Sequence, residues 1–381
     1  MKKLTDICDI QYGYAFDSKC FTEEPLYPPL VRIRDVKRGY SETYYSGDYS
    51  EEYLITSGDL LIGMDGEFNI ARWKSDRALL NQRVCKLTAK KGTNEEYLRF
   101  AMAKVLKEIE QKTAFVTVKH LSAKELNKLY LNVPELSKQN KIAGILSRLE
   151  NIIDVRRQEL EKLDELIKAR FVEMFGDPQI NPFGWDVLNI AEVIDGKVSN
   201  GFFAKRDDYC ENGNVSVLGV ANIVNRMYSK IDNLPRTYAV DKDIKKFEIK
   251  YGDMLFCRSS LVAEGIGKAS IVPENVQANV LFECHVIRLP LNLNKCIPEF
   301  MQVLSTMDFF RNQVIAQSKT ATMTTIGQEG ILKTDIILPP IEKQKEFYIF
   351  VKQVDKSKVV VQKALDETQL LFDSLMQKYF G

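Results

Sequence analysis

Two short stretches of this sequence contain the residue types of catalytic loops, but each lacks part of the pattern. Residues 265–269 read GIGKA, as at the end of a phosphate-binding loop. Such a loop requires glycine at the position of Val262 and serine or threonine at that of Ala269, so the match fails. Residues 181–184 read NPFG, which lacks the second proline of a motif used to methylate amino groups. This stretch also follows a predicted helix end, and we interpret it as a linker turn.

Other candidates for chemistry are equally incomplete. Glu248 and Lys250 could form half of a nuclease motif, but no partner acid lies at a suitable spacing. The chain has two histidines, His120 and His285, and although Cys284 adjoins the second, no further ligand pair has metal-site spacing. No serine or cysteine triad signature is present. We therefore expect no catalytic residues and no metal site, with His120 as a hydrogen-bonded surface residue.

A Gly-Asp turn that leads into an apolar strand and then into a polar loop occurs twice. The two copies are SGDLLIGMDGEFNIARW (57–73) and YGDMLFCRSSLVAEGIGKASIV (251–272). The loops contain types that bind base edges in DNA, where Arg pairs with guanine, Asn with adenine, and Asp or Glu with cytosine. An ordinary turn entering a core is the alternative interpretation. The candidate DNA contacts are Asp65, Glu67, Asn69, Arg72, Arg258, Ser259, Ser260 and Lys268.

Further candidates combine cations with aromatic or amide side chains, as contacts to phosphates and bases require. In the first half of the chain they are Arg32, Arg34, Lys37, Arg38, Tyr40 and Tyr44. In the second half they are Phe203, Lys205, Arg206, Asn222, Asn225 and Arg226. Stretches that precede the predicted long helices add Lys119, Lys319, Thr320 and Thr322 as possible backbone contacts. For any single residue, a solvated strand position is an equally good interpretation.

The elements that must position these residues are duplicated. Residues 133–176 align without a gap with residues 338–381, at an offset of 205, so that Pro134 matches Pro339. The segments between are related less tightly: residues 10–16 match 198–204, and 57–63 match 251–257. A period this long indicates two copies of a whole module, not a solenoid. Two such modules suit a ligand that has two related halves.

The repeated tails are predicted to be long helices. Apolar residues recur every three or four positions, interrupted by Arg156 in the first copy and by Lys358 and Thr368 in the second. We expect the two helices to pair antiparallel along this seam, with a stripe of about 50 Å that exceeds one DNA turn of about 34–36 Å. Two unrelated core helices are the alternative. The predicted pairing residues are Leu149, Ile153, Leu160, Leu163, Ile167, Val354, Val361, Leu365 and Phe372.

The predicted fold is therefore mixed α+β. Two β-rich α/β domains are separated by two long helices that pair as an antiparallel coiled coil, with an internal pseudo-two-fold repeat. The predicted ranges are a first domain at 1–133, a first helix at 134–177, a second domain at 178–337 and a second helix at 338–381.

Bulk composition limits the class of protein. The 381 residues are 45% apolar and carry a net charge of +1, which leaves nucleic-acid binding open. No apolar run approaches the length of about 20 residues needed to span a bilayer, and the N-terminus lacks an apolar signal core. The seven cysteines show no CxxC spacing. We therefore expect a cytoplasmic protein with reduced thiols and no membrane partner.

The order of two segments and two helices, the paired Gly-Asp strands, and the helices after VPELSKQ and LPPIEKQ resemble one family. It is the specificity (S) subunit of type I restriction-modification enzymes. Asn81-Gln82 in LLNQRVCKL also matches its first-domain pattern, whereas the second copy, VLFECHVIRL, departs from it. The resemblance implies two target-recognition domains, each contacting half of a bipartite double-stranded DNA sequence. It implies helices that set the spacer and dock two methyltransferase subunits, joined by motor-nuclease subunits. S-adenosylmethionine, ATP and Mg²⁺ would then be bound by the partners, and no cofactor by this chain.

Two other functions remain as alternatives. The chain could be a coiled-coil interaction scaffold that recognises no DNA sequence, in which case its surface charge should be scattered instead of forming a basic stripe shared by both domains. It could also be a nuclease or methyltransferase acting alone, against which the missing motifs argue.

Overall fold

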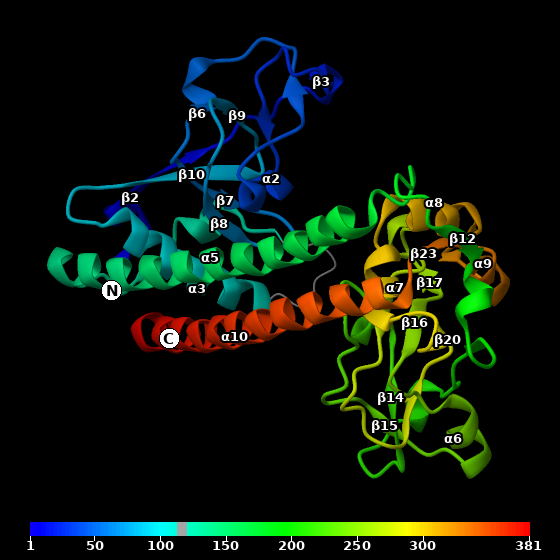
Figure 1. Cartoon of the computed structure of the whole chain (residues 1–381). Helices are drawn as coiled ribbons and strands as arrows, with labels where there is room; N and C mark the ends of the chain where they lie inside the picture. The colour runs from blue at the N-terminus through cyan, green and yellow to red at the C-terminus, as the bar shows by residue number, and fades with distance from the viewer. Residues whose placement is uncertain (113–119) are drawn as a thin grey trace. The chain divides into compact units, whose positions relative to one another are not determined.

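The chain folds into two compact units (Figure 1). The computed structural model describes residues 1–112 and 120–381. Unit 1 comprises residues 1–157 and 362–381, and unit 2 comprises residues 158–361. The boundaries fall inside the two longest helices, α5 (Leu136–Phe175) and α10 (Ile341–Phe380), of 40 residues each. Each unit therefore contains one globular segment and about half of each long helix, so the compact units cut across the ranges predicted in chain order.

Unit 1 is built on small antiparallel and mixed sheets. The four-stranded sheet has the order β2 (Cys8–Tyr12), β10 (Val84–Ala89), β7 (Leu60–Gly63), β8 (Asn69–Arg72). The three-stranded sheet has the order β4 (Leu30–Val31), β9 (Ala78–Leu80), β6 (Leu54–Ile55). The remaining pairs are β1 (Lys2–Lys3) with β11 (Tyr130–Leu131) and β3 (Phe21–Thr22) with β5 (Tyr44–Tyr45). The shorter helices are α1 (Leu4–Ile7), α2 (Ile33–Arg38), α3 (Glu95–Lys112) and α4 (Ala123–Leu126).

Unit 2 repeats this plan with additional elements. Its four-stranded sheet has the order β13 (Ser199–Asn200), β20 (Val286–Pro290), β16 (Asp253–Cys257), β18 (Ala269–Ile271). Its three-stranded sheets are β15 (Arg236–Thr237), β14 (Val215–Leu218), β19 (Val280–Phe282), and β17 (Ser259–Ser260), β22 (Thr324–Thr325), β21 (Lys319–Thr320). A further pair is β12 (Asp186–Asn189) with β23 (Asp335–Leu338). The shorter helices are α6 (Asp241–Phe247), α7 (Pro298–Leu304), α8 (Asp308–Ala316) and α9 (Gln328–Leu332).

The Gly-Asp turn has the same geometry in both units. Gly58 and Gly252 have φ of 93° and 89°, a left-handed conformation that glycine adopts without steric cost. The carboxylates of Asp59 and Asp253 accept hydrogen bonds from backbone N–H groups three residues earlier, at 2.8 and 2.9 Å. Behind each turn, strands β7 and β16 are wholly buried. The turn therefore fixes where the central strand of each four-stranded sheet begins.

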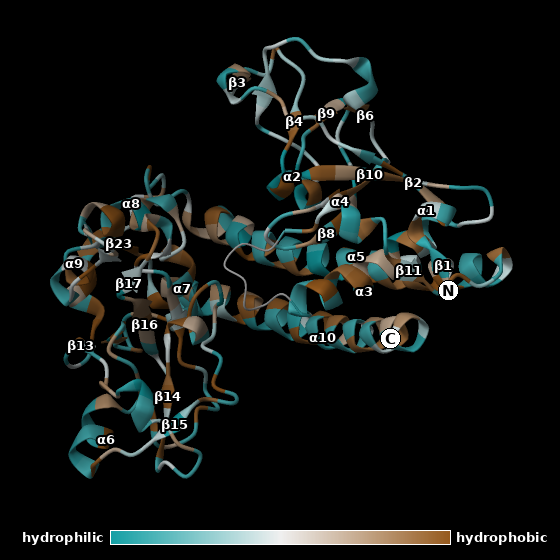
Figure 2. Ribbon diagram, turned by 180° about the vertical axis from the view of Figure 1, so that it is seen from behind, coloured by the Kyte–Doolittle hydropathy of each residue, from teal (hydrophilic) through white to brown (hydrophobic). Residues whose placement is uncertain are grey.

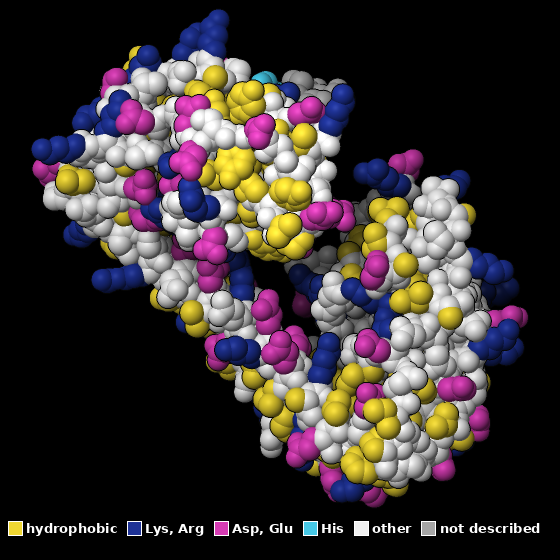
Figure 3. Space-filling view, turned by 90° about the horizontal axis from the view of Figure 1, so that it is seen from above, with side chains coloured by type: hydrophobic (Ala, Val, Ile, Leu, Met, Phe, Trp, Pro, Cys, Tyr) yellow, Lys and Arg dark blue, Asp and Glu magenta, His cyan; other side chains and the backbone are white. Residues whose placement is uncertain are grey.

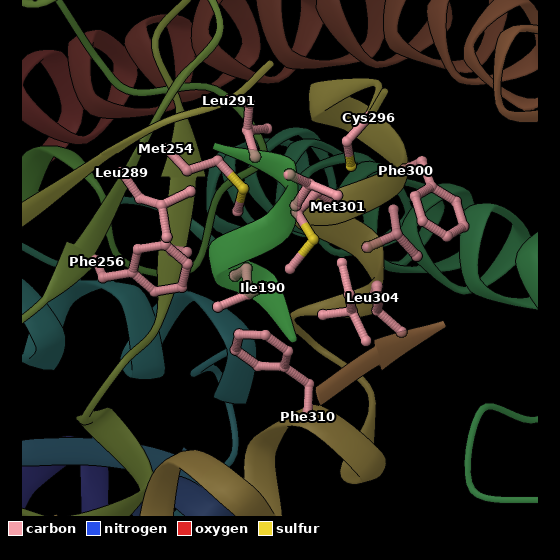
Figure 4. Packing of buried hydrophobic residues seen from close by; sticks show 14 of the residues in the cluster. Ile190, Met254, Phe256, Leu289, Leu291, Cys296, Phe300, Met301, Leu304 and Phe310 are labelled. Carbon is pink, nitrogen blue, oxygen red and sulfur yellow. The ribbon is translucent and has the colours of Figure 1, made fainter. Parts of the chain in front are cut away.

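Each core is completed by the long helices. In unit 1, α3 and the four-stranded sheet pack against the first turns of α5 and against the last turns of α10, where the Tyr97 and Phe380 rings lie 5.2 Å apart. In unit 2 the last turns of α5 meet the first turns of α10. Phe171 and Phe175 of α5 pack there against Phe347 of α10 and Phe300 of α7. Figure 4 shows the aromatic and sulfur-containing side chains that fill this core around Ile190. Both cores therefore need one end of each long helix.

Within each unit the two long helices run antiparallel. The polar residues that interrupt the apolar seam are bonded to groups on the opposite helix. In unit 1 the guanidinium of Arg156 donates to the carbonyl of Ala364 and to the Thr368 hydroxyl. In unit 2 the ammonium of Lys358 lies 2.6 Å from the Asp164 carboxylate. Figure 2 shows hydrophobic and hydrophilic residues alternating along both helices. The nine predicted pairing residues are all buried or half-buried.

A buried glutamine fixes the start of each long helix. The Gln139 amide accepts from the N–H of Asn94 at 2.9 Å and donates to the carbonyls of Gly92 and Pro134. The Gln344 amide makes the same three bonds, to Ile297, Lys295 and Pro339. Both side chains are at most 1% exposed. Each helix therefore begins just after its proline and is bonded to the loop in front of α3 or α7.

Candidate nucleic-acid interface

The loops of unit 1 gather several predicted contact residues around a groove. The backbone N–H of Arg32 donates to the Asp35 carboxylate at 2.9 Å, which holds the start of α2 and leaves the Arg32 side chain exposed. Arg32 and Arg34 together line two hollows of about 770 and 460 Å³. Tyr44 lines the first hollow, and Asn81, Gln82 and Arg83 line the second. Amide, guanidinium and aromatic groups are thus brought together, as base and phosphate contacts require.

The other cations of α2 form an exposed cluster beside this groove. Lys37 lies 3.5 Å from Glu67, and Arg38 lies 3.5 Å from Glu42. The Arg38 guanidinium also stacks 4.9 Å above the ring of Tyr40. Exposed ion pairs of this kind contribute at most about 1 kcal/mol. These cations can therefore exchange a carboxylate for a phosphate at little cost.

The stretch that follows β7, from the loop at 64–68 through β8, is bonded to the rest of unit 1 more than the sequence suggested. Arg72 lies 2.9 Å from Glu95 and 2.5 Å from Glu96, both on α3. Burial lowers the pKa of the Arg72 guanidinium, but the bonds and charges of Glu96 and then Glu95 outweigh it, so the pKa is raised. Arg72 does not line the groove.

The remaining candidates of this loop are also bonded locally. Asp65 contacts His120 and lies 3.2 Å from Arg83, and the Asn69 amide donates to the Glu67 carbonyl at 3.0 Å. The candidate Lys119 lies outside the described residues.

In unit 2 the structure brings one group of candidates together in the sheet β17-β22-β21. Ser259 and Ser260 form β17, while Lys319 and Thr320 form β21 on the far side of β22. The Arg258 guanidinium donates to the Cys284 carbonyl at 3.1 Å. Thr322 is exposed in the turn between β21 and β22. These groups form a small polar sheet beside the central strand β16.

A second group of unit 2 candidates meets at a different place. Lys268 donates to the Asn225 side chain at 2.7 Å, and both line a pocket together with Arg226. Asn222 does not line that pocket. Its carboxamide accepts from the Gly219 N–H and donates to the Lys230 carbonyl, so it is bonded within its own loop.

Three further candidates of unit 2 lie on a separate turn. Phe203, Lys205 and Arg206 are all exposed there, with Phe203 at 68%. The DNA contacts proposed from the sequence all remain predictions.

Sequence reasoning did not select two residues that the structure brings to these sites. Arg83 lines the unit 1 groove and lies 3.2 Å from Asp65, and its position directly after Asn81-Gln82 was a usable signal. Arg311 lines the unit 2 pocket, but it comes from α8, far along the chain from Lys268. No local pattern marks such a residue.

The described residues show little that would support catalysis or metal binding. Burial raises the pKa of the Cys8 and Cys296 thiols to about 12, which keeps them protonated and unreactive. Residues 1–112 and 120–381 contain no group of three side chains placed to hold a metal ion. Over the same residues, no helix is both long and apolar enough to cross a membrane.

Surface charge is mixed on the face seen in Figure 3. Lys and Arg side chains are interspersed with Asp and Glu on each unit, with no continuous stripe of one sign. On this face, the cationic residues form local clusters among carboxylates. Charge alone therefore does not separate DNA binding from a scaffold function.

Comparison with known proteins gives consistent matches. The sequence profile described as "Type I restriction modification DNA specificity domain" matches residues 1–165 and 182–368. The chain is 27% identical over 408 aligned positions to the type I restriction enzyme EcoBI specificity subunit of Escherichia coli, covering 99% of this chain and 84% of that protein. It is 22% identical over 356 positions to the MjaVIII specificity subunit of Methanocaldococcus jannaschii, covering 86% and 82%.

A solved structure shares the fold. The S subunit of a type I restriction-modification system from M. genitalium superposes with a TM-score of 0.56 at 12% identity, over 100% of this chain and 95% of that one. The similarity confirms the predicted mixed fold of two domains and two long helices.

Proposed function

The chain belongs to the type I restriction-modification DNA specificity family, and we propose that it selects the target of a multisubunit adenine methyltransferase and endonuclease. Membership confirms the family predicted from the repeated layout, and recognition of a DNA target is the role of this family. The chain is thus a recognition subunit. The observation that carries the proposal is the match of the family to both halves of the chain, which parallels the internal repeat.

Each unit contacts one half of a bipartite DNA sequence. This is supported by the equivalent four-stranded sheets β2-β10-β7-β8 and β13-β20-β16-β18, which share a framework while their loops differ. In unit 1 the groove around Arg32, Arg34 and Asn81 would contact the first half-site. In unit 2 the polar sheet around Arg258 and the Lys268 pocket would contact the second. Different loops on the same framework would give two different half-sites.

The paired helices set the distance between the half-sites. Their antiparallel register in each unit, with Arg156 bonded to Ala364 and Lys358 to Asp164, supports a fixed spacer. Insertion of one heptad into both helices, which preserves the seam periodicity, should lengthen the spacer while keeping both half-sites. A spacer unchanged by the insertion would contradict this role.

Two methyltransferase subunits dock on the helices, one on each unit. The support is a pair of exposed apolar positions that recurs at the repeat offset: Val155 matches Val360, and Leu166 matches Leu371. Val155 and Leu371 belong to unit 1, whereas Leu166 and Val360 belong to unit 2. Changing Val155 and Leu371 to Asp should remove one methyltransferase from the complex, as measured by native mass spectrometry. Changing Leu166 and Val360 to Asp should remove the other methyltransferase subunit.

S-adenosylmethionine, ATP and Mg²⁺ are assigned to the partner subunits. The methyltransferases would use S-adenosylmethionine for adenine methylation, and the motor-nuclease subunits would use ATP and Mg²⁺. This chain would contribute no cofactor and no catalytic group.

A methylation map tests the central proposal. The chain is expressed with its methyltransferase partner in a host without DNA methylation, and N6-methyladenine is located by single-molecule sequencing. The expected result is a split motif, with two short specific blocks around a fixed unspecified gap. Exchange of residues 1–130 for those of a relative should then change one block only, and a change in both would contradict separate recognition.

A scaffold without sequence recognition is the second candidate, and the mixed surface charge in Figure 3 is compatible with it. A stable complex with the methyltransferase that produces no new methylation would support the scaffold and contradict target selection.

A further inference from the structure

A pocket of about 360 Å³ in unit 2, called here the cationic pocket, gathers four positive side chains. Lys168 comes from α5, Arg226 from the loop between β14 and β15, Lys268 from the position directly before β18, and Arg311 from α8. The acid that lines it, Asp164, already lies 2.6 Å from Lys358. Among the described residues, the pocket therefore has a surplus of positive charge that internal ion pairs do not neutralise.

Arg311 is held in place with part of its hydrogen-bonding capacity unused. One guanidinium nitrogen donates to the carbonyls of Glu264 and Ile266 at 3.1 and 2.6 Å. The other terminal nitrogen is buried and has no hydrogen-bond partner among residues 1–112 and 120–381. Burial lowers the pKa of this guanidinium. An unpaired buried donor of this kind is unfavourable, and a bound anion would offset that cost.

The wall of the pocket next to α8 is closely packed. Gly267 has φ of 61° and packs so closely on α8 that a Cβ there would lie 2.3 Å from a methyl group of Val314. The Gln302 amide, 6% exposed, donates to the Ala269 carbonyl at 3.3 Å. The GIGKA stretch, which fails as a phosphate-binding loop by its sequence, thus supplies one wall and the lysine of a cationic pocket. The Lys268 ammonium is held by Asn225 and the Arg311 guanidinium by two backbone carbonyls, so these two charges are preorganised before any ligand arrives.

We propose that the cationic pocket binds a phosphate group. Guanidinium forks bind phosphate through paired hydrogen bonds, and lysines add point charges around the remaining oxygens. A carboxylate would neutralise less of the surplus charge. The volume lies near the lower end of the range of about 300–1,000 Å³ seen for small-ligand sites. Ile167, Met227 and Val303 give the pocket an apolar side that suits the sugar or base next to a phosphate.

The phosphate has two possible sources, the DNA backbone or a free nucleotide or phosphate ion. The DNA source rests on the proposed function and adds a backbone contact in the second half-site to it. The free source is independent of it and would make the pocket a small-ligand site of the subunit.

The test uses the full chain, the double variant Arg226→Gln/Lys268→Gln and the control Lys242→Gln. Neither Arg226 nor Lys268 is buried, and Lys242 is an exposed lysine of α6 outside the pocket. The variant Arg311→Lys keeps the positive charge but removes the planar guanidinium that can form paired hydrogen bonds to a phosphate. Circular dichroism melts establish that each variant folds. Inorganic phosphate and AMP are titrated calorimetrically, and a short duplex of unrelated sequence is titrated by fluorescence anisotropy over a salt series.

If the source is DNA, the double variant binds the duplex more weakly, and its salt slope falls by about 1 for each phosphate that the protein no longer binds. If the source is a free ligand, phosphate or AMP binds the wild type and binds the double variant about tenfold more weakly, a loss of about 1.4 kcal/mol, with duplex binding unchanged. Equal binding of all probes by the double variant and Lys242→Gln overturns the proposal. Wild-type chain that binds no duplex would instead count against the proposed function, and the phosphate and AMP titrations would still decide for or against the pocket.

Discussion

Each unit has a glutamate at the equivalent position of the helix that packs on its four-stranded sheet, Glu96 of α3 in unit 1 and Glu299 of α7 in unit 2. The surroundings shift the pKa values of the two carboxyl groups in opposite directions. In unit 1 burial raises the pKa of Glu96, but hydrogen bonds and charge from Arg99 and then Arg72 outweigh it, so the pKa is lowered. In unit 2 Glu299 is fully buried, receives a hydrogen bond from the Tyr228 hydroxyl at 2.9 Å, and burial raises its pKa. The duplicated framework has thus kept a position while its electrostatic role has reversed.

The turn between β9 and β10 in unit 1 and the equivalent turn between β19 and β20 in unit 2 show a similar divergence. In unit 1 the Asn81 side chain accepts, among residues 1–112 and 120–381, only from the adjacent N–H of Gln82, and Gln82 and Arg83 are exposed. In unit 2 the equivalent Glu283 accepts from the N–H of Val220 at 2.7 Å and so holds a neighbouring loop. Both units have this turn. In unit 1 its side chains are available to a ligand, whereas in unit 2 the Glu283 carboxylate is bonded to the backbone of a neighbouring loop.

The shared turn predicts the largest effect on stability. Alanine at Gly13 or Gly201 would place a Cβ 2.1 or 2.2 Å from a backbone carbonyl oxygen, Asn81 in one case and Glu283 or Phe282 in the other. Each substitution should destabilise its own unit by about 3 kcal/mol, because backbone cannot move aside easily. Urea denaturation with hydrogen exchange in each unit would measure this. The control Gly144→Ala, in open space on α5, should be neutral or stabilising.

Tolerance of alanine at one glycine but not at the other would show that the two turns do not share the tight approach.

The buried glutamines predict the next largest effect. Gln139→Ala and Gln344→Ala should each cost about 2–3 kcal/mol, because each leaves buried backbone groups without partners. The two losses should be alike and should each fall in one unit when measured by hydrogen exchange. Gln158→Ala, at an exposed position of α5, serves as the control and should change stability by no more than about 0.5 kcal/mol. Unequal losses would mean that only one helix start depends on this anchor.

The paired glutamates predict opposite responses to substitution at neutral pH. Glu96→Gln should cost about 1–2 kcal/mol in unit 1, because it removes the carboxylate that both Arg72 and Arg99 contact. Glu299→Gln should be neutral or stabilising by about 1 kcal/mol, since it removes the cost of a buried charge and keeps an acceptor for Tyr228.

The pH dependence follows from the same shifts. The lowered pKa of Glu96 contributes stability that is present above the ordinary glutamate pKa and is lost as pH falls through the folded-state pKa. The raised pKa of Glu299 favours folding fully below the ordinary value, and that stability is lost as pH rises through the folded-state pKa. The slope for Glu96 should therefore appear below pH 4.5 and that for Glu299 above pH 4.5, the ordinary glutamate value, and each Gln variant should flatten the slope in its own unit. Slopes of the same sign would contradict the reversal.

The turn residues predict the smallest difference. Glu283→Ala should cost about 1 kcal/mol, because the N–H of Val220 loses its acceptor. Asn81→Ala should change stability by no more than about 0.5 kcal/mol while altering the first block of the methylated sequence. An equal cost in both units would show that Asn81 also has a structural role.

Much of the fold could be predicted because its signals are periodic and local. The offset of 205 identified both helices, and the Gly-Asp pairs marked the starts of β7 and β16. The partners of Arg156 and Lys358 could not be predicted, since they depend on the antiparallel register of two helices far apart in the chain.

The candidate site was less accessible to sequence reasoning. Base-contacting residue types were predicted after the two Gly-Asp strands, but nothing local indicates that Arg72 pairs with two acids on α3. Likewise Arg311 joins Lys268 only through the packing of α8. Residue type predicts what a side chain can bind, whereas the tertiary fold decides which of those partners is within reach.

The division of both long helices between the units has a consequence for synthesis. The unit 1 core needs Phe372 and Phe380 from the segment 362–381, which the ribosome makes only after all of unit 2. Until those residues are made, the apolar surface of unit 1 that they cover stays exposed. Unit 2 is contiguous in the sequence, so it can fold as soon as residues 158–361 have been made. A premature stop before Phe372 should thus damage the recognition domain that was translated first and leave the second one intact.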